Sequence, residues 1–93
     1  MSTFSASIAQ EAKIDSLKQL LAETADDSNR AEILIKLGSL VDKYDPEKSI
    51  NYSLEALELF SKQNDIRGRA RTLNKIGYNH WQLGKFLETI NYY

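Results

Sequence analysis

The sequence predicts an all-α fold of antiparallel helical hairpins that repeat along the chain. From Lys13 onward, apolar residues recur with the spacing of one side of a helix. A single Pro and four Gly leave long stretches in which nothing interrupts a helix. The chain is also similar to itself at a shift of about 39 residues, which is typical of repeat proteins. Hairpins of this kind bury their flanks by stacking into an α-solenoid.

The internal repeat sets the domain organisation. When Ala31 is placed over Ala70, the identities continue through Leu34, Lys36 and Gly38, which fall on Leu73, Lys75 and Gly77. The triplet Ile-Asn-Tyr recurs at 50–52 and 90–92, one residue out of that register. We therefore predict a flexible tail at 1–11, an N-terminal capping helix at 12–27, a first repeat at 28–65 and an incomplete second repeat at 66–93.

The capping helix is amphipathic, and the first helix of the first repeat follows it. The capping helix carries apolar residues in line at Ile14, Leu17, Leu20 and Leu21. Asp27 or Ser28 can cap the next helix, because their side-chain oxygens accept hydrogen bonds from its first N–H groups. The apolar face of that helix is expected at Ala31, Leu34, Leu37, Val41 and Tyr44.

The pair Asp45-Pro46 separates the two helices of the first repeat. Pro disfavours a helical residue before it but is favoured at the first position of a helix, where Asp45 can act as the cap. The second helix is expected to bury Ile50, Leu54, Leu57 and Phe60. The polar turn at 63–65 then ends it, and Asp65 can cap the next helix.

The second repeat is expected to open with a helix that buries Ala70, Leu73, Ile76, Gly77 and His80. Residues 83–86 predict a break, after which a fourth helix turns back onto the third with Phe86, Ile90 and Tyr93. Gly38 and Gly77 lie inside helices, where Gly costs about 1 kcal/mol relative to Ala. A cost that recurs at one position of the repeat indicates that a partner helix crosses closely there.

The segment Leu-Asn-Lys-Ile-Gly-Tyr-Asn-His-Trp-Gln-Leu-Gly-Lys-Phe at 73–86 resembles a tetratricopeptide repeat. That family has a large residue, then Leu-Gly, an aromatic residue, and Leu-Gly-x-aromatic at the turn. Here His80 and Val41 replace the usual aromatic residue, Thr89 replaces a small Ala, and the period exceeds the usual ~34 residues. The resemblance implies a scaffold that binds proteins or peptides, with no cofactor and no enzymatic activity.

Three further segments resemble one particular subgroup of tetratricopeptide arrays. Residues 13–17, 45–48 and 64–68 are similar to long-period arrays that precede kinase, cyclase or DNA-binding modules in bacterial signalling proteins. This similarity implies that the chain is the N-terminal part of a larger signalling or regulatory protein, an argument by association. Because Tyr93 falls within the predicted fourth helix, we also expect self-association through an open C-terminal repeat.

The family's concave groove, carried over to this sequence, gives a candidate binding site. Its residues would be Ile35, Ser39 and Asp42, with Glu32 and Lys43, in the first repeat, and Arg71, Asn74, Tyr78, Trp81 and Gln82 in the second. Trp, Tyr and Arg are frequent anchors of protein interfaces. Alternatively, Trp81 packs against a third repeat that would follow the second. Arg67, Arg71 and Lys75 form a basic stripe that either holds a carboxylate or phosphate or simply faces solvent.

Composition restricts the other function classes. A net charge of −1 argues against nucleic acid, although an RNA-binding repeat remains an alternative, as does a structural spacer or dimerisation segment. No apolar run is long enough for membrane insertion. Without Cys or further His, a metal site at His80 is not expected, and packing in the core is. The cytoplasm is favoured, or the periplasm if Ser7-Ile8-Ala9 is the remnant of a signal peptide.

Overall fold

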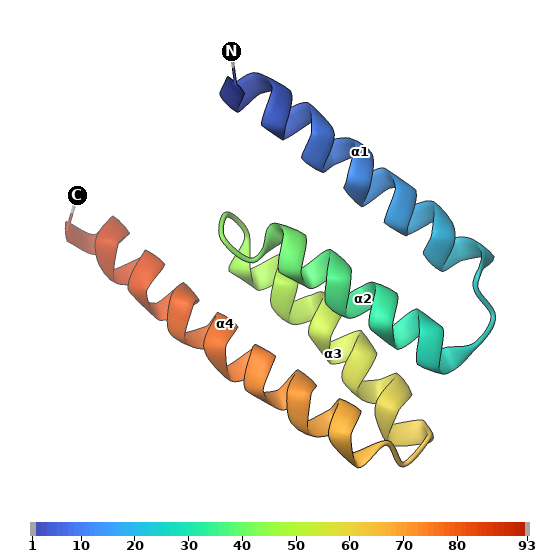
Figure 1. Cartoon of the computed structure of the whole chain (residues 1–93). Helices are drawn as coiled ribbons and strands as arrows, with labels where there is room; N and C mark the ends of the chain where they lie inside the picture. The colour runs from blue at the N-terminus through green and yellow to red at the C-terminus, as the bar shows by residue number, and fades with distance from the viewer. Residues whose placement is uncertain (1, 93) are drawn as a thin grey trace.

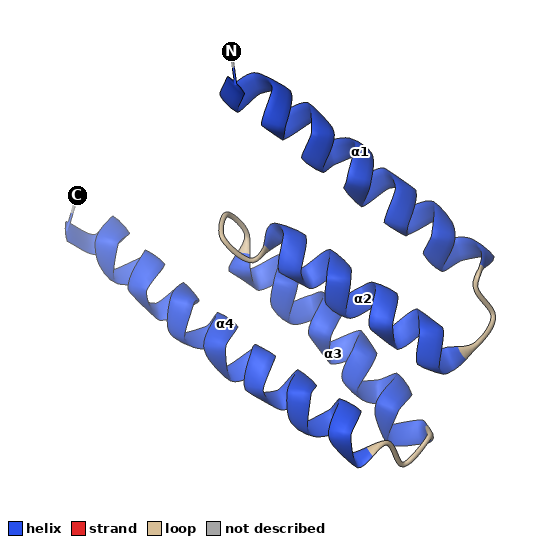
Figure 2. Ribbon diagram, viewed as in Figure 1, coloured by secondary structure: helices blue, strands red, loops and turns tan. Residues whose placement is uncertain are grey.

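The computed structural model contains four helices joined by short turns (Figure 1). It describes the backbone of residues 2–92 and the side chains of residues 8–85 and Leu87. The helices are α1 (Ser2–Glu23), α2 (Asp27–Val41), α3 (Pro46–Lys62) and α4 (Ile66–Tyr92). Within residues 2–92 no strand is present (Figure 2), so the predicted all-α class is confirmed.

Aspartate side chains start three of the helices. The carboxylate of Asp26 accepts a hydrogen bond from the amide of Asn29 at 3.0 Å, so Asp26, and not the expected Asp27 or Ser28, caps α2. Asp45 caps α3 through the amide of Lys48 at 3.0 Å, and Pro46 occupies the first turn, as predicted. Asp65 caps α4 in the same manner, which confirms the third predicted cap. Local sequence therefore determines where these helices begin.

The hydrophobic core lies between α2 and α3. Its centre consists of Ala31, Leu34, Ala56 and Phe60. The predicted face of α2 is confirmed for Ala31, Leu34, Leu37 and Val41, all buried, whereas Tyr44 is 61% exposed. The face of α3 is partly wrong, because Leu54 is 49% exposed while Ser49 and Ser53 are fully buried. Small hydroxyl side chains are needed there because α2 and α4 both approach α3 closely.

Residues 2–11 form part of a helix and not the predicted tail. α1 begins at Ser2, because the small and helix-favouring residues of this stretch contain no Pro or Gly to interrupt it. The side-chain amide of Gln10 donates a hydrogen bond to the carbonyl of Leu40, which joins α1 to α2. At the other end, Arg30 donates to the carbonyls of Leu21 and Thr24 at 2.8 and 3.1 Å. These bonds satisfy carbonyls that the end of α1 leaves open.

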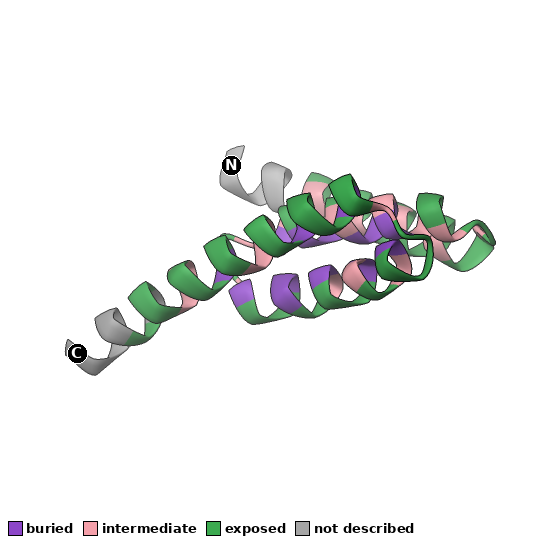
Figure 3. Ribbon diagram, turned by 90° about the horizontal axis from the view of Figure 1, so that it is seen from below, coloured by how far each residue is buried: buried purple, intermediate pink, exposed green. Residues whose placement is uncertain are grey.

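The predicted break at 83–86 is absent, and α4 continues as one helix to Tyr92. Gly84 keeps a negative φ, and no Pro interrupts the segment, so the local sequence tolerates an unbroken helix. In Figures 1 and 3 the C-terminal part of α4 projects beyond the end of the α2–α3 hairpin. The expected packing of Phe86, Ile90 and Tyr93 concerns side chains outside the described residues. No described helix is both long and apolar enough to cross a membrane.

The buried side of α4 differs from the predicted one. Gly68, Thr72 and Asn79 are buried against α3. Of the five residues predicted to be buried, only Ile76 is partly covered, and the others are exposed: Ala70, Leu73, Gly77 and His80. The prediction of a packed His80 is therefore wrong. The hydrophobic pattern of α4 was interpreted correctly as one face of a helix, but α3 covers the opposite side.

The two repeated glycines have different surroundings. A Cβ on Gly38 would lie 3.2 Å from Oγ of Ser49 on α3, so the predicted close crossing is confirmed there. A Cβ on Gly77 would meet nothing within 4 Å, and the close crossing predicted at Gly77 is wrong. The second close contact occurs instead at Gly68, where a Cβ would lie 2.5 Å from the ring of Phe60. The close contact at Gly68 was not predicted from the sequence.

Candidate functional site

Two ion pairs join α2 to α4 across the predicted groove. Arg71 contacts Glu32 at 2.7 Å, and Lys75 contacts Asp42 at 3.3 Å. The ammonium of Lys75 also donates to Oγ of Ser39 at 2.7 Å. The structure thus brings together one side of α2 and one side of α4, which we call the α2–α4 surface.

These contacts show which residues of the basic stripe are paired with acidic side chains. The hydrogen bond and then the charge of Glu32 raise the pKa of Arg71 above its already high ordinary value, so this guanidinium stays protonated. Arg71 and Lys75 are neutralised by α2, and Arg67 alone of the three has no ion pair among the described residues. Two of the three residues of the stripe therefore bridge α2 and α4, and only Arg67 is left without an ion pair among the described residues.

An aromatic cluster lies further along α4. The rings of Tyr78 and Trp81 stack with centroids 6.1 Å apart, and the side chains are 52% and 57% exposed. The ammonium of Lys85 lies 4.5 Å from the centroid of the Trp81 ring. Asn74, one turn before Tyr78, is exposed as well. Within the described residues Trp81 does not pack between helices, and its ring is accessible from solvent.

The predicted groove residues divide into two groups. Ser39, Arg71, Asn74, Tyr78 and Trp81 are exposed. The others are half-buried: Ile35, Asp42 and Gln82. Ile35 packs against the core of α2 and α3, and the side-chain oxygen of Gln82 is shielded from solvent without a hydrogen-bond partner among the described residues. Gln82 therefore does not share the open face of Tyr78 and Trp81.

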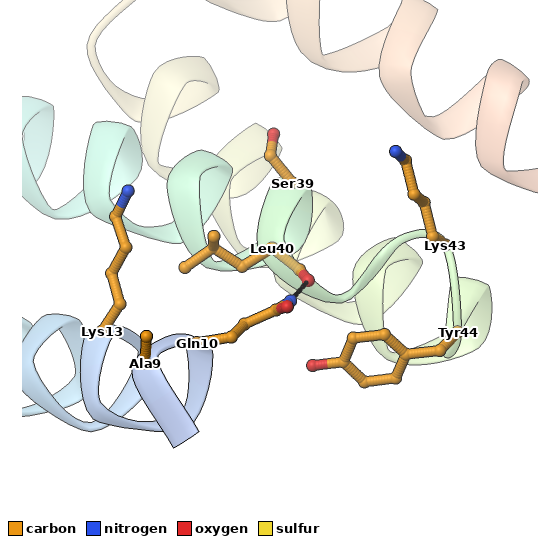
Figure 4. Close-up of a pocket in the computed structure, with 7 residues that line it drawn as sticks. All are labelled: Ala9, Gln10, Lys13, Ser39, Leu40, Lys43 and Tyr44. Carbon is orange, nitrogen blue, oxygen red and sulfur yellow. Dashed lines mark hydrogen bonds between the residues drawn. The ribbon is translucent and has the colours of Figure 1, made fainter. Parts of the chain in front are cut away.

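A hollow between α1 and α2 was not predicted. One part of it, with a volume of about 390 Å³, is lined by residues of both helices and the following turn (Figure 4): Ala9, Gln10, Lys13, Ser39, Leu40, Lys43 and Tyr44. A second part, of about 420 Å³, shares Lys13, Ser39 and Leu40 and adds Leu17, Ile35 and Lys36. The two parts share three lining residues and therefore adjoin, and we call them together the α1–α2 groove.

The α1–α2 groove combines apolar surface with positive charge. Leu17, Ile35 and Leu40 supply apolar surface. Lys13, Lys36 and Lys43 stand along it, and none of these three lysines makes an ion pair with another described residue. Ser39 belongs both to this groove and to the α2–α4 surface, so the two are adjacent across α2. The groove was not predictable from the sequence, because residues 1–11 were expected to form a flexible tail and not the first turns of α1.

A small polar cluster is buried where α3 meets α4. The amide nitrogen of Asn79 donates to Oγ of Ser49 at 2.8 Å, and both side chains are 0% exposed. The side-chain oxygens of Asn79 and Ser53 have no hydrogen-bond partner among the described residues. Nearby, the hydroxyl of Thr72 donates to the carbonyl of Gly68 at 2.6 Å. The hydrogen bond to Ser49 fixes the position of α4 on α3, because a buried donor without a partner is costly.

The described residues contain no group of three or more His, Cys, Asp or Glu side chains arranged to hold a metal ion. Comparison with known proteins gave no family model, no curated protein and no solved structure that matches this chain.

Proposed function

We propose that the chain is a protein-interaction module of the tetratricopeptide type, in which helical hairpins stack into an α-solenoid. It binds a peptide segment of another protein along the exposed side of α2, between α1 and α4. The observation that supports this most directly is the α1–α2 groove, which combines apolar surface with three lysines that have no ion pair among the described residues. Sites for peptides commonly pair an apolar surface with a few charged groups that fix orientation.

The charge of the groove specifies the peptide. Lys13, Lys36 and Lys43 favour carboxylate side chains, while Leu17 and Leu40 favour an apolar side chain between them. The chain as a whole carries a net charge of −1, so this local excess of cations is not a general property of its surface. We therefore propose an acidic peptide with apolar residues as the ligand. The exposed Tyr78 and Trp81 extend the surface on the side of α4.

A displayed library of random peptides, selected against the whole chain, tests the proposal. Selected peptides should be enriched in Asp and Glu beside Leu, Ile or Phe. Binding of a selected peptide should weaken on Lys36→Glu or Lys43→Glu. Lys48→Glu is the matched control, because Lys48 is exposed at the start of α3, outside the groove, and the substitution changes the net charge equally.

Two outcomes would contradict the proposal. The first is the absence of acidic sequences among the selected peptides, or equal binding by the Lys36→Glu and Lys48→Glu variants. The second is tighter binding of a single-stranded RNA oligonucleotide than of any selected peptide, with an affinity that falls steeply with salt. The single Trp81 supplies a fluorescence signal for both titrations.

A further inference from the structure

The outer side of α4 carries a line of residues in which large and small side chains alternate. We call it the α4 seam, and it consists of Ile66, Ala70, Leu73, Gly77, His80, Gly84 and Leu87. Their separations alternate between four and three residues, which is the spacing of a contact line between two helices packed along each other. All seven are exposed, and Ile66, Leu73 and Leu87 are 78%, 52% and 50% accessible. Large apolar side chains aligned on one open face mark an interaction surface.

The internal repeat supplies an independent observation. Three residues of the seam are identical to buried residues of α2 at a shift of 39: Ala70 to Ala31, Leu73 to Leu34 and Gly77 to Gly38. In α2 these positions lie beneath α3, which packs so closely that a Cβ on Gly38 would lie 3.2 Å from Ser49. In α4 a Cβ on Gly77 or Gly84 would meet no atom within 4 Å. The same pattern that receives an antiparallel helix in α2 is therefore uncovered in α4.

We propose that the α4 seam binds the α4 seam of a second copy of this chain, with the two helices antiparallel. A two-fold axis at the level of Lys75 would place three of the four large residues opposite a small one. Leu73 then faces Gly77 of the partner subunit, Ile66 faces Gly84 of the partner subunit, and His80 faces Ala70 of the partner subunit. A parallel pair in register would instead set Leu73 against its own equivalent and leave a gap at each glycine.

Self-complementarity is the reason to choose a second copy as the occupant. The arrangement is accessible, because α3 contacts the opposite side of α4 through Gly68, Thr72 and Asn79. One helix face of residues 66–87 is about 33 Å long, which places the interface at the small end of the range for specific contacts. The dimer should accordingly be weak.

Cross-linking tests the orientation, and the absence of Cys from the sequence makes it simple. Asn74 lies beside the proposed axis, so Asn74→Cys should form a disulfide with Asn74→Cys of a second copy under mild oxidation. Arg67→Cys should not, because its equivalent lies at the other end of the interface. Equal cross-linking by both variants would indicate a parallel pair or random collision, and either result overturns the proposal.

Sedimentation equilibrium tests the surface itself. The unaltered chain should show a monomer–dimer equilibrium. Gly77→Leu should raise the dissociation constant at least about tenfold, because its side chain occupies the space for Leu73 of the partner subunit, while the open surroundings of Gly77 leave the monomer folded. Leu73→Glu should raise it on the order of a hundredfold, since two buried leucines are lost per dimer. The matched control is Leu54→Glu, at a 49% exposed leucine of α3 outside the seam.

A chain that remains monomeric at every concentration contradicts the proposal. So does a dimer that Gly77→Leu leaves unchanged, or one that Leu54→Glu weakens equally. Lys36→Glu should not affect the dimer, since it alters the α1–α2 groove. The proposal of self-association is therefore tested independently of the proposal of peptide binding.

Discussion

Replacement of Gly68 by alanine should destabilise the fold, although alanine is ordinarily the better residue inside a helix. The new Cβ would lie 2.5 Å from Cδ1, 2.7 Å from Cγ and 2.8 Å from Cε1 of the Phe60 ring. Phe60 is only 1% exposed and packs with Ala31 and Leu34 in the core, so its ring cannot move into solvent without opening a cavity. Either the ring leaves its position or α4 moves away from α3.

The size of the effect follows from two opposing contributions. Overpacking a buried site typically costs about 1–3 kcal/mol. The change from Gly to Ala returns at most about 1 kcal/mol of helix propensity. With the full gain subtracted, we expect Gly68→Ala to lower the free energy of unfolding by up to about 2 kcal/mol, and the melting temperature by up to about 15 °C in a domain of this size.

Urea denaturation followed by far-ultraviolet circular dichroism measures the loss, with Gly77→Ala as the control. Gly77 has no neighbour within 4 Å of an added Cβ, so the control should gain about 0.5–1 kcal/mol. If Gly68→Ala is as stable as Gly77→Ala, the steric argument is refuted. A double-mutant cycle with Phe60→Leu sharpens the test, because the smaller side chain should relieve most of the penalty of Gly68→Ala.

Three other comparisons probe the contacts between helices. Gly38→Val should lower the free energy of unfolding by about 1–3 kcal/mol, because the new side chain overpacks against Ser49. Gly77→Val should change it by less than about 1 kcal/mol, because the surroundings of Gly77 are open. Equal urea midpoints for the two variants would contradict this difference in surroundings. Asn79→Ala should lower the free energy of unfolding by about 1–3 kcal/mol, because it removes a buried hydrogen bond to Ser49, and an unchanged melting temperature would show that this bond is dispensable. Glu32→Gln should cost less than about 1 kcal/mol in the same assay, since its ion pair with α4 is exposed, and a larger loss would show that the pair is shielded.

Much of the local structure could be predicted from the sequence. The turns at Asp45-Pro46 and at 63–65, the caps of α3 and α4 and the buried face of α2 are as expected. These features depend on neighbouring residues: a carboxylate reaches an amide three residues away, and an apolar stripe of α2 needs only one adjacent helix to cover it. The close approach at Gly38 was also predictable, because a glycine within an apolar helical face leaves space for a crossing helix.

The face that each helix presents to its neighbours was decided only by the tertiary structure. The apolar pattern of α4 resembles that of α2, yet α3 covers it in α2 and leaves it open in α4. Gly68 lies outside that pattern, and its role arises from the nearby ring of Phe60 on α3. The α1–α2 groove likewise requires the first turns of α1 to be helical and to lie against α2. The sequence by itself thus determined the central helices and where three of them begin, because capping and periodicity act within a few residues, but it missed the first turns of α1 and placed a break in α4 that is absent. Which side of α4 is buried depended on helix packing, because an apolar stripe does not by itself specify the helix that covers it.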